Sequence, residues 1–208
     1  MNILILTQED AFYIPKMIDH VIAECDNVVG VGIVPGEMRR GSFRRYWKMM
    51  GPRDFVIVCV NLVWHKVMDT ISRVIPTSFS YSVYQAACRA QVPVEKVPNV
   101  NSLDYVDSLR KRNVDLIVSV ACPQILSKRI LTVPKHGAIN IHGGLLPQYQ
   151  GLLPSFWVLA KGEKETGVTI HYVDEKIDHG GILAQKRLKI RADDTVHSLV
   201  RRSKIEVG

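Results

Sequence analysis

Residues 2–36 have the sequence NILILTQEDAFYIPKMIDHVIAECDNVVGVGIVPG, and this stretch decides the fold. Asn2–Thr7 is an apolar run of strand length, and Val28–Val34 is a β-branched run that ends at a Pro-Gly turn. Between them, residues 11–24 have apolar side chains at helical spacing, with Asp10 as the expected N-cap. A strand, a helix and a second strand in this order predict a parallel sheet with a right-handed crossover.

The rest of the chain continues this alternation. We expect strands at residues 94–97, 114–120, 138–142, 168–173 and 182–190, and helices at residues 82–90, 103–112, 154–161 and 195–204. Residues 41–75 are ambiguous, because their β-branched content favours a strand whereas the lack of Gly and Pro between Arg53 and Ile75 favours helix; we expect two helices. The sequence therefore predicts one α/β domain over residues 1–208, with a Rossmann-like, mostly parallel twisted sheet flanked by helices.

Composition is that of an ordinary globular chain, with 208 residues, 47% of them hydrophobic and 23% charged. The net charge of +7 favours anionic ligands, although a solvated basic surface would give the same value. No uninterrupted apolar run reaches the roughly 18 residues of a membrane span. The N-terminus has no basic leader or small-residue cleavage site. We therefore expect a cytoplasmic protein that has no membrane partner.

The four cysteines, Cys25, Cys59, Cys88 and Cys122, lie far apart and form no CxxC pair. We expect reduced, buried thiols and no metal site.

Asn140-Ile141-His142 places an amide and an imidazole two residues apart on an expected strand. This spacing puts both side chains on one face of the sheet, with Ile141 on the other. An amide donor beside a titratable ring suits the stabilisation of an oxyanion. The motif alone is weak evidence, since a histidine at a strand end is more often structural.

Three further motifs follow this strand. A glycine-rich loop leaves its carboxyl end, where ligands bind in open α/β sheets, and contains Leu145-Leu146-Pro147 with Tyr149 and Gly151. Then come Gly167-Val168-Thr169-Ile170-His171 and Asp178-His179-Gly180-Gly181-Ile182. Asp178 lies in a glycine-flanked loop, from which its carboxylate could reach His142.

Together the four motifs resemble the signature of the formyltransferase superfamily, which includes enzymes that formylate glycinamide ribonucleotide, methionyl-tRNA and nucleotide-linked sugars. The resemblance implies that Asn140, His142 and Asp178 are catalytic. It also implies transfer of a formyl group from 10-formyltetrahydrofolate to a primary amine, without a metal. His171 and His179 lie close to these motifs but lack the spacing of zinc ligands. Trp157, on the following helix, is expected in the core, with stacking on an acceptor as the alternative.

The same resemblance assigns folate contacts to two segments, 121–126 and 173–178. The expected folate-binding residues are Ala121, Cys122, Gln124, Ile125, Leu126, Val173, Asp174 and Ile177. The expected substrate-loop residues are Gly144, Leu146, Pro147, Tyr149, Gly151 and Thr169. For Thr169 and Gly151, strand packing and turn geometry are the alternative explanations.

Two departures from the family bear on the acceptor. Gln150 stands where the family loop usually has an arginine, and residues 7–10 do not form the Gly- and Ser-rich phosphate loop of the purine-pathway enzymes. Glycinamide ribonucleotide is therefore a poor candidate. We favour a small amine such as a nucleotide-linked amino sugar.

Two alternatives stay open. The first is methionyl-tRNA, whose enzymes carry a further basic β-barrel domain, and the second is a non-catalytic ligand-binding domain of the same fold. The last expected helix lies close to Gly208, which suggests that the domain continues beyond this point. A homodimer is one option for the oligomeric state.

Overall fold

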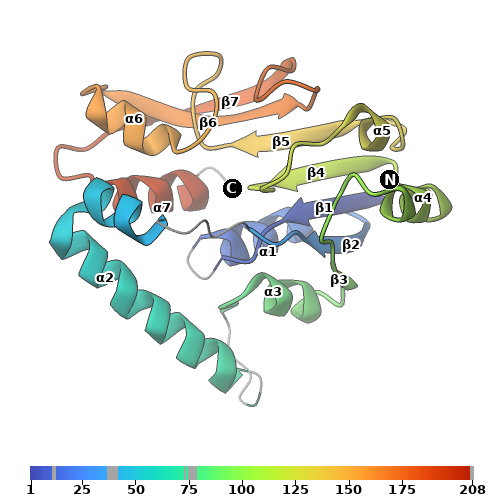
Figure 1. Cartoon of the computed structure of the whole chain (residues 1–208), viewed down its shortest axis with the longest axis horizontal. Helices are drawn as coiled ribbons and strands as arrows, with labels where there is room; N and C mark the ends of the chain where they lie inside the picture. The colour runs from blue at the N-terminus through green and yellow to red at the C-terminus, as the bar shows by residue number, and fades with distance from the viewer. Residues whose placement is uncertain (11–12, 37–41, 73, 75–78, 207–208) are drawn as a thin grey trace.

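The computed structural model describes residues 1–10, 13–36, 42–72, 74 and 79–206. These residues form a seven-stranded sheet in the order β3-β2-β1-β4-β5-β6-β7 (Figure 1). The strands are β1 (Ile3–Thr7), β2 (Val28–Ile33), β3 (Val94–Lys96), β4 (Leu116–Val120), β5 (Ala138–His142), β6 (Glu165–Tyr172) and β7 (Ile182–Lys189). The first five strands are parallel to their neighbours, whereas β6 and β7 are antiparallel. The prediction of a mostly parallel α/β sheet is confirmed.

Helices cover both faces of this sheet. They are α1 (Ile14–Glu24), α2 (Ser42–Ser72), α3 (Val83–Arg89), α4 (Leu103–Lys111), α5 (Lys128–Leu131), α6 (Pro154–Ala160) and α7 (Val196–Glu206). The N-cap of α1 is Tyr13, so the expectation that Asp10 caps this helix is wrong. Asp10 lies before the helix, where its Oδ1 accepts the N–H groups of Tyr13 at 2.7 Å and Ile14 at 3.3 Å. The short α5 was not expected, because four residues are too few to show a helical period.

The core explains why residues 3–6 of β1 are all apolar. Leu4 and Leu6 pack in one buried cluster with residues of α4 and α5. Ile3 and Ile5 pack in a second cluster with residues of α1 and α3, on the opposite face. A central parallel strand is buried on both faces, so its side chains do not alternate with polar ones.

The prediction of two helices within residues 41–75 is wrong for the described residues. Residues 42–72 form the single helix α2, with Pro52 inside it. Proline removes one hydrogen bond and bends a helix without necessarily ending it, and α2 continues through Pro52. Figure 1 shows α2 changing direction and then reaching away from the sheet.

The second half of α2 is unusually apolar for an exposed helix. Residues Phe55–Ser72 have a mean hydropathy of 1.4, and only 6% of this window is buried. By length and composition the helix is apolar enough to cross a membrane, even though polar residues interrupt it.

Candidate active site

Strand β5 positions the first two candidate catalytic residues. Ala138 packs in the α4 and α5 cluster, whereas Ile139 and Ile141 contact the opposite cluster. Because side chains alternate along a strand, Asn140 and His142 share the face of Ala138. His142 is buried and Asn140 is partly buried. The structure therefore places the amide and the imidazole side by side, as their spacing predicts.

Asp178 reaches these residues from the loop between β6 and β7. Its Oδ2 lies 3.3 Å from His142 Nδ1, and its Oδ1 accepts a hydrogen bond from Asn140 Nδ2 at 3.3 Å. This loop begins where β5 begins, since Tyr172 pairs with Ile139. Asp178 therefore meets Asn140 and His142 over the face of β5, and its carboxylate reaches His142 as expected.

His171 is a fourth member of this network that sequence reasoning missed. It pairs with Asn140 in the register of β5 and β6. Its Nε2 lies 3.2 Å from Asn140 Nδ2 and 3.4 Å from Asp178 Oδ1. The sequence did contain a signal, because His171 is two residues from Thr169 and thus on the same face of β6.

The contacts in this network shift the pKa values of Asp178 and His171. Burial acts to raise the pKa of Asp178, but hydrogen bonds from His171 and the Gly151 N–H and the charge of His142 hold it below its ordinary value. Burial acts to lower the pKa of His171, but hydrogen bonds to Asp178 and the Tyr172 carbonyl raise it above 6.5. Asp178 is therefore a carboxylate at neutral pH.

The loop after β5 closes over His142. The Nε2 atom of His142 lies 2.6 Å from the carbonyl oxygen of Tyr149. A Cβ atom at Gly144 would lie 3.0 Å from the same Nε2 and 2.8 Å from Pro154 Cβ, so glycine allows this close approach. Gly151 has a φ of +88° and donates its N–H to Asp178 Oδ2 at 2.9 Å.

Thr169 fixes the start of this loop from β6. Its buried hydroxyl donates to the Gly144 carbonyl at 2.6 Å and accepts from the Leu146 N–H at 3.2 Å. Gln185 of β7 donates to the Leu146 carbonyl at 2.8 Å. The peptide between Leu146 and Pro147 is cis. The predicted loop residues thus form one hydrogen-bonded structure around His142.

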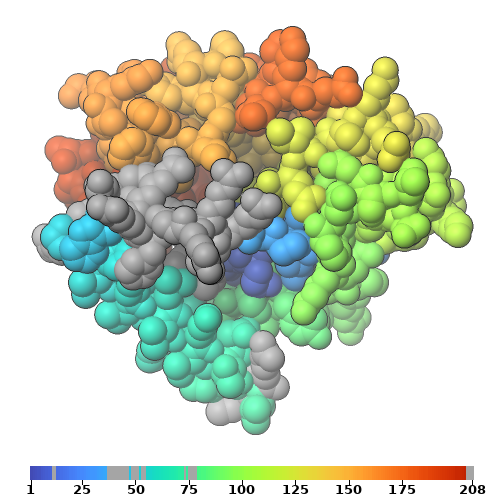
Figure 2. Space-filling model, in the orientation of Figure 1, coloured from blue at the N-terminus to red at the C-terminus, as the bar shows by residue number. Residues whose placement is uncertain are grey.

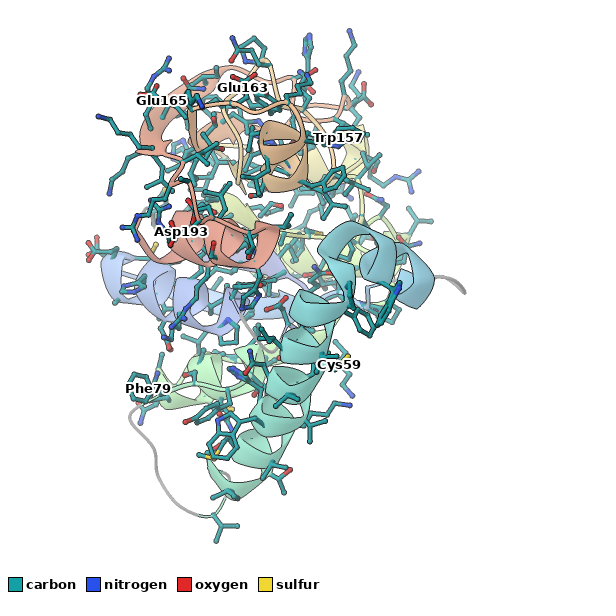
Figure 3. The ribbon with its side chains drawn as sticks, turned by 90° about the vertical axis from the view of Figure 1, so that its left-hand side faces the viewer. Cys59, Phe79, Trp157, Glu163, Glu165 and Asp193 are labelled. Carbon is teal, nitrogen blue, oxygen red and sulfur yellow. The ribbon has the colours of Figure 1, made fainter. Side chains whose placement is uncertain are left out.

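Other predicted loop contacts run elsewhere. The phenol of Tyr149 donates to Glu163 Oε1 at 2.5 Å, so this residue meets His142 through its main chain alone. Gln150 stands where the family loop usually has an arginine, and its side chain donates to the Asp178 carbonyl at 2.9 Å. Trp157 is 50% exposed, so its expected place in the core is wrong (Figure 3).

The segment 121–126, predicted to contact folate, follows β4, and some of its side chains serve the fold. Gln124 bridges the Val100 N–H and the Pro98 carbonyl at 3.0 and 2.7 Å. Leu126 is 2% exposed and packs in the core. Cys122 is partly buried, which raises the pKa of its thiol, and Ala121 has a positive φ. Ile125 is exposed.

The second folate segment follows β6. Val173 packs on the α4 and α5 cluster, and its N–H donates to the Ala138 carbonyl at 2.8 Å. Asp174 accepts from His179 at 2.8 Å, whereas Ile177 is exposed. Both segments therefore border the sheet face that carries Asn140 and His142. In the described part of the chain, no group of three or more His, Cys, Asp or Glu residues could hold a metal ion.

Comparison with known proteins identifies this arrangement. The family model described as formyl transferase matches residues 82–206, which is more than half of the chain. The chain belongs to the formyl transferase family. The match includes all four motifs and every residue of the network around Asp178.

The chain is similar to two kinds of curated protein. The chain is 40% identical over 148 residues to the bifunctional polymyxin resistance protein ArnA of Wigglesworthia glossinidia brevipalpis, covering 69% of this chain and 23% of that protein. It is 45% identical over 111 residues to a methionyl-tRNA formyltransferase of Anaeromyxobacter sp. (strain K), covering 53% and 36%. The chain thus spans about a quarter to a third of the length of these relatives.

A solved phosphoribosylglycinamide formyltransferase from Streptococcus pneumoniae TIGR4 has the same fold, with a TM-score of 0.66 and 19% identity. The alignment covers 99% of this chain and 91% of that one. At this identity the likeness shows the fold alone.

Proposed function

We propose that this domain transfers a formyl group from 10-formyltetrahydrofolate to a primary amine. One observation carries the proposal, which is the meeting of Asn140, His142 and Asp178 within hydrogen-bonding distance on one sheet face. Membership of the formyl transferase family supports the reaction class.

The proposed reaction begins when the neutral amine attacks the formyl carbon. The carbonyl oxygen then becomes an oxyanion, which the Asn140 amide and the protonated His142 ring stabilise by donating hydrogen bonds. One such donor is worth about 3–4 kcal/mol of the barrier. Because His142 Nε2 lies 2.6 Å from the Tyr149 carbonyl, this contact must give way for that nitrogen to serve the oxyanion.

Asp178 has two roles in this proposal. Its carboxylate holds the His142 ring by its Nδ1 atom. It also accepts the proton that the attacking amine loses, directly or through water. The oxyanion then re-forms the carbonyl as the bond between the formyl carbon and the folate nitrogen breaks, and this nitrogen takes up the proton held by Asp178, directly or through water. Holding donor and amine together supplies a further share of the rate.

The donor would lie against the segments 121–126 and 173–178. Main-chain groups of these loops would bind the pterin, and the exposed side chains of Ile125 and Ile177 offer apolar contacts. Ala121, Cys122, Val173 and Asp174 would shape this pocket through their backbone.

For the acceptor we propose a small phosphorylated amine such as a nucleotide-linked amino sugar. The net charge of +7 suits an anionic substrate of this kind. Methionyl-tRNA is the second candidate, because it is the acceptor named in a relative that is 45% identical over 111 residues. We propose a cytoplasmic location, since all four cysteines are free.

The test offers 10-formyltetrahydrofolate to the protein together with either amino-sugar nucleotides or charged methionyl-tRNA, and follows the release of tetrahydrofolate. We expect release that depends on an acceptor and is lost in His142→Ala. Release at the same rate without any acceptor, or near-normal activity in His142→Ala, would show that the proposed transfer is wrong.

A further inference from the structure

Helix α2 carries an apolar surface that the formyl-transfer site does not use. Seven exposed side chains recur three or four residues apart, so they lie on one side of the helix. This outer face of α2 consists of Val56, Ile57, Val60, Val63, Trp64, Val67 and Ile71, which are 40–64% exposed. A shallow groove on it is lined by residues of α2 alone. Monomeric proteins rarely expose an apolar patch of this extent.

The opposite side of α2 is tied to the body of the protein. The His65 ring packs edge-on against Tyr81 with centroids 5.7 Å apart. The Gln85 side chain of α3 donates to the Asp69 carbonyl at 3.0 Å and to the Ser72 hydroxyl. A helix that crossed a bilayer would carry Ser72 to the far side, whereas these bonds hold it beside α3. The outer face must therefore be covered while α2 stays alongside the domain.

Figures 1 and 3 both show α2 reaching past the sheet, and in Figure 3 its Cys59 lies well away from Trp157 of α6. Helix α2 thus extends beyond the sheet, and part of its surface is exposed in the lower part of the view in Figure 2. A flat partner could reach the outer face without contacting the site on β5.

Charge indicates which partner fits. Residues 39–53, which lead into and form the first half of α2, contain six basic residues and no acidic one. The acidic residues of α2 are Asp54 and Asp69. A second copy of this chain would match the apolar face but would bring a second basic segment without acidic residues to pair with. An anionic lipid surface matches both features, since it offers apolar chains and negative headgroups.

We propose that α2 binds this protein to an anionic membrane surface, with the outer face buried at the boundary between headgroups and acyl chains. Trp64 is the kind of side chain that favours this boundary. The helix lies in the plane of the interface and does not span it, because its carboxyl end stays bonded to α3. The domain would then work at the cytoplasmic leaflet, where anionic lipids are concentrated.

The test is co-sedimentation of the whole chain with vesicles of phosphatidylcholine alone or with a third of phosphatidylglycerol, at low and at high salt. We expect binding to the anionic vesicles that weakens with salt. Val63→Gln should weaken it roughly tenfold, because a half-buried valine is lost from the lipid. Arg44→Gln with Arg45→Gln should weaken it about fivefold for each residue.

Leu103→Gln is the matched control, because Leu103 of α4 is 61% exposed and Val63 is 64% exposed. It should bind like the wild type. Equal binding to neutral and anionic vesicles would overturn the proposal. An equal loss of binding in Val63→Gln and Leu103→Gln would overturn it as well. So would a dimer in sedimentation velocity that Val63→Gln converts to monomer without any vesicle binding, since the face would then serve a second copy. The assay contains no formyl donor, so its outcome is independent of the proposed reaction.

Discussion

Replacing Asp178 with Asn tests the proposed chemistry at the residue on which most contacts converge. The carboxylate lies within 3.3–3.4 Å of His142, His171 and Asn140 and accepts the Gly151 N–H at 2.9 Å. Asparagine has nearly the same shape and keeps one acceptor oxygen, so the loop should still fold. It loses the negative charge that faces the two imidazole rings, and it can no longer accept a proton.

The expected loss follows from these two effects. A hydrogen bond to a charged group is worth about 1.5–3 kcal/mol, and a positioned general base contributes about 10²–10⁴ in rate. We therefore expect kcat to fall about 10²- to 10⁴-fold, which is roughly 3–5 kcal/mol of barrier, with little change in KM for the folate. Steady-state kinetics with saturating acceptor measure this.

The control is Glu175→Gln, which removes a carboxylate from an exposed position in the same loop. It should keep wild-type kcat, and circular dichroism should show that both variants are folded. If folded Asp178→Asn retains more than about a tenth of the wild-type kcat, the roles assigned to Asp178 are refuted.

Three further predictions concern how the site is built. Gly180→Ala should lower kcat and lower the stability by about 1–3 kcal/mol, because the new Cβ would lie 1.9 Å from the Tyr172 carbonyl oxygen. Gly181→Ala has open space around its new Cβ, so melting and rate assays should show no change in either quantity. Because the pKa of His171 is raised above 6.5, its protonated ring stabilises the fold below that pH, and this contribution is lost as the pH rises through the folded pKa. An NMR titration of His171 should give a midpoint above 6.5, and this midpoint should drop in Asp178→Asn. Thr169→Val should cost about 1–3 kcal/mol in chemical denaturation, since it leaves the buried Leu146 N–H without its partner; an unchanged midpoint would contradict the loop role.

The sequence predicted most of the sheet, because central strands and amphipathic helices leave clear periodic patterns. The run from Ile3 to Leu6 is apolar throughout, and all five positions of β1 are buried. Strand β5 was predicted at the bounds that the structure gives it. Helix α2 was harder, because β-branched residues and a proline argue against helix locally, whereas the length of the apolar segment decides for it.

The site was partly visible in the sequence. The spacing of Asn140 and His142 placed them on one face, and the motif order brought Asp178 within reach. His171 was set aside because His171 and His179 lack the spacing of zinc ligands, and only the pairing of β6 with β5 shows that His171 faces Asn140. Which side chains of residues 121–126 serve the core could not be read from a loop without a period, as Leu126 illustrates.

The most direct test follows the formyl carbon itself. The donor is made with ¹³C in the formyl group, mixed with the acceptor that releases tetrahydrofolate, and the products are read by ¹³C NMR. We predict that the label appears as an N-formyl amide on the acceptor, in equal amount to the tetrahydrofolate formed, and that Asp178→Asn delivers almost none. Label that ends as free formate would mean that water, and not an amine, takes the formyl group at this site, and would contradict the account.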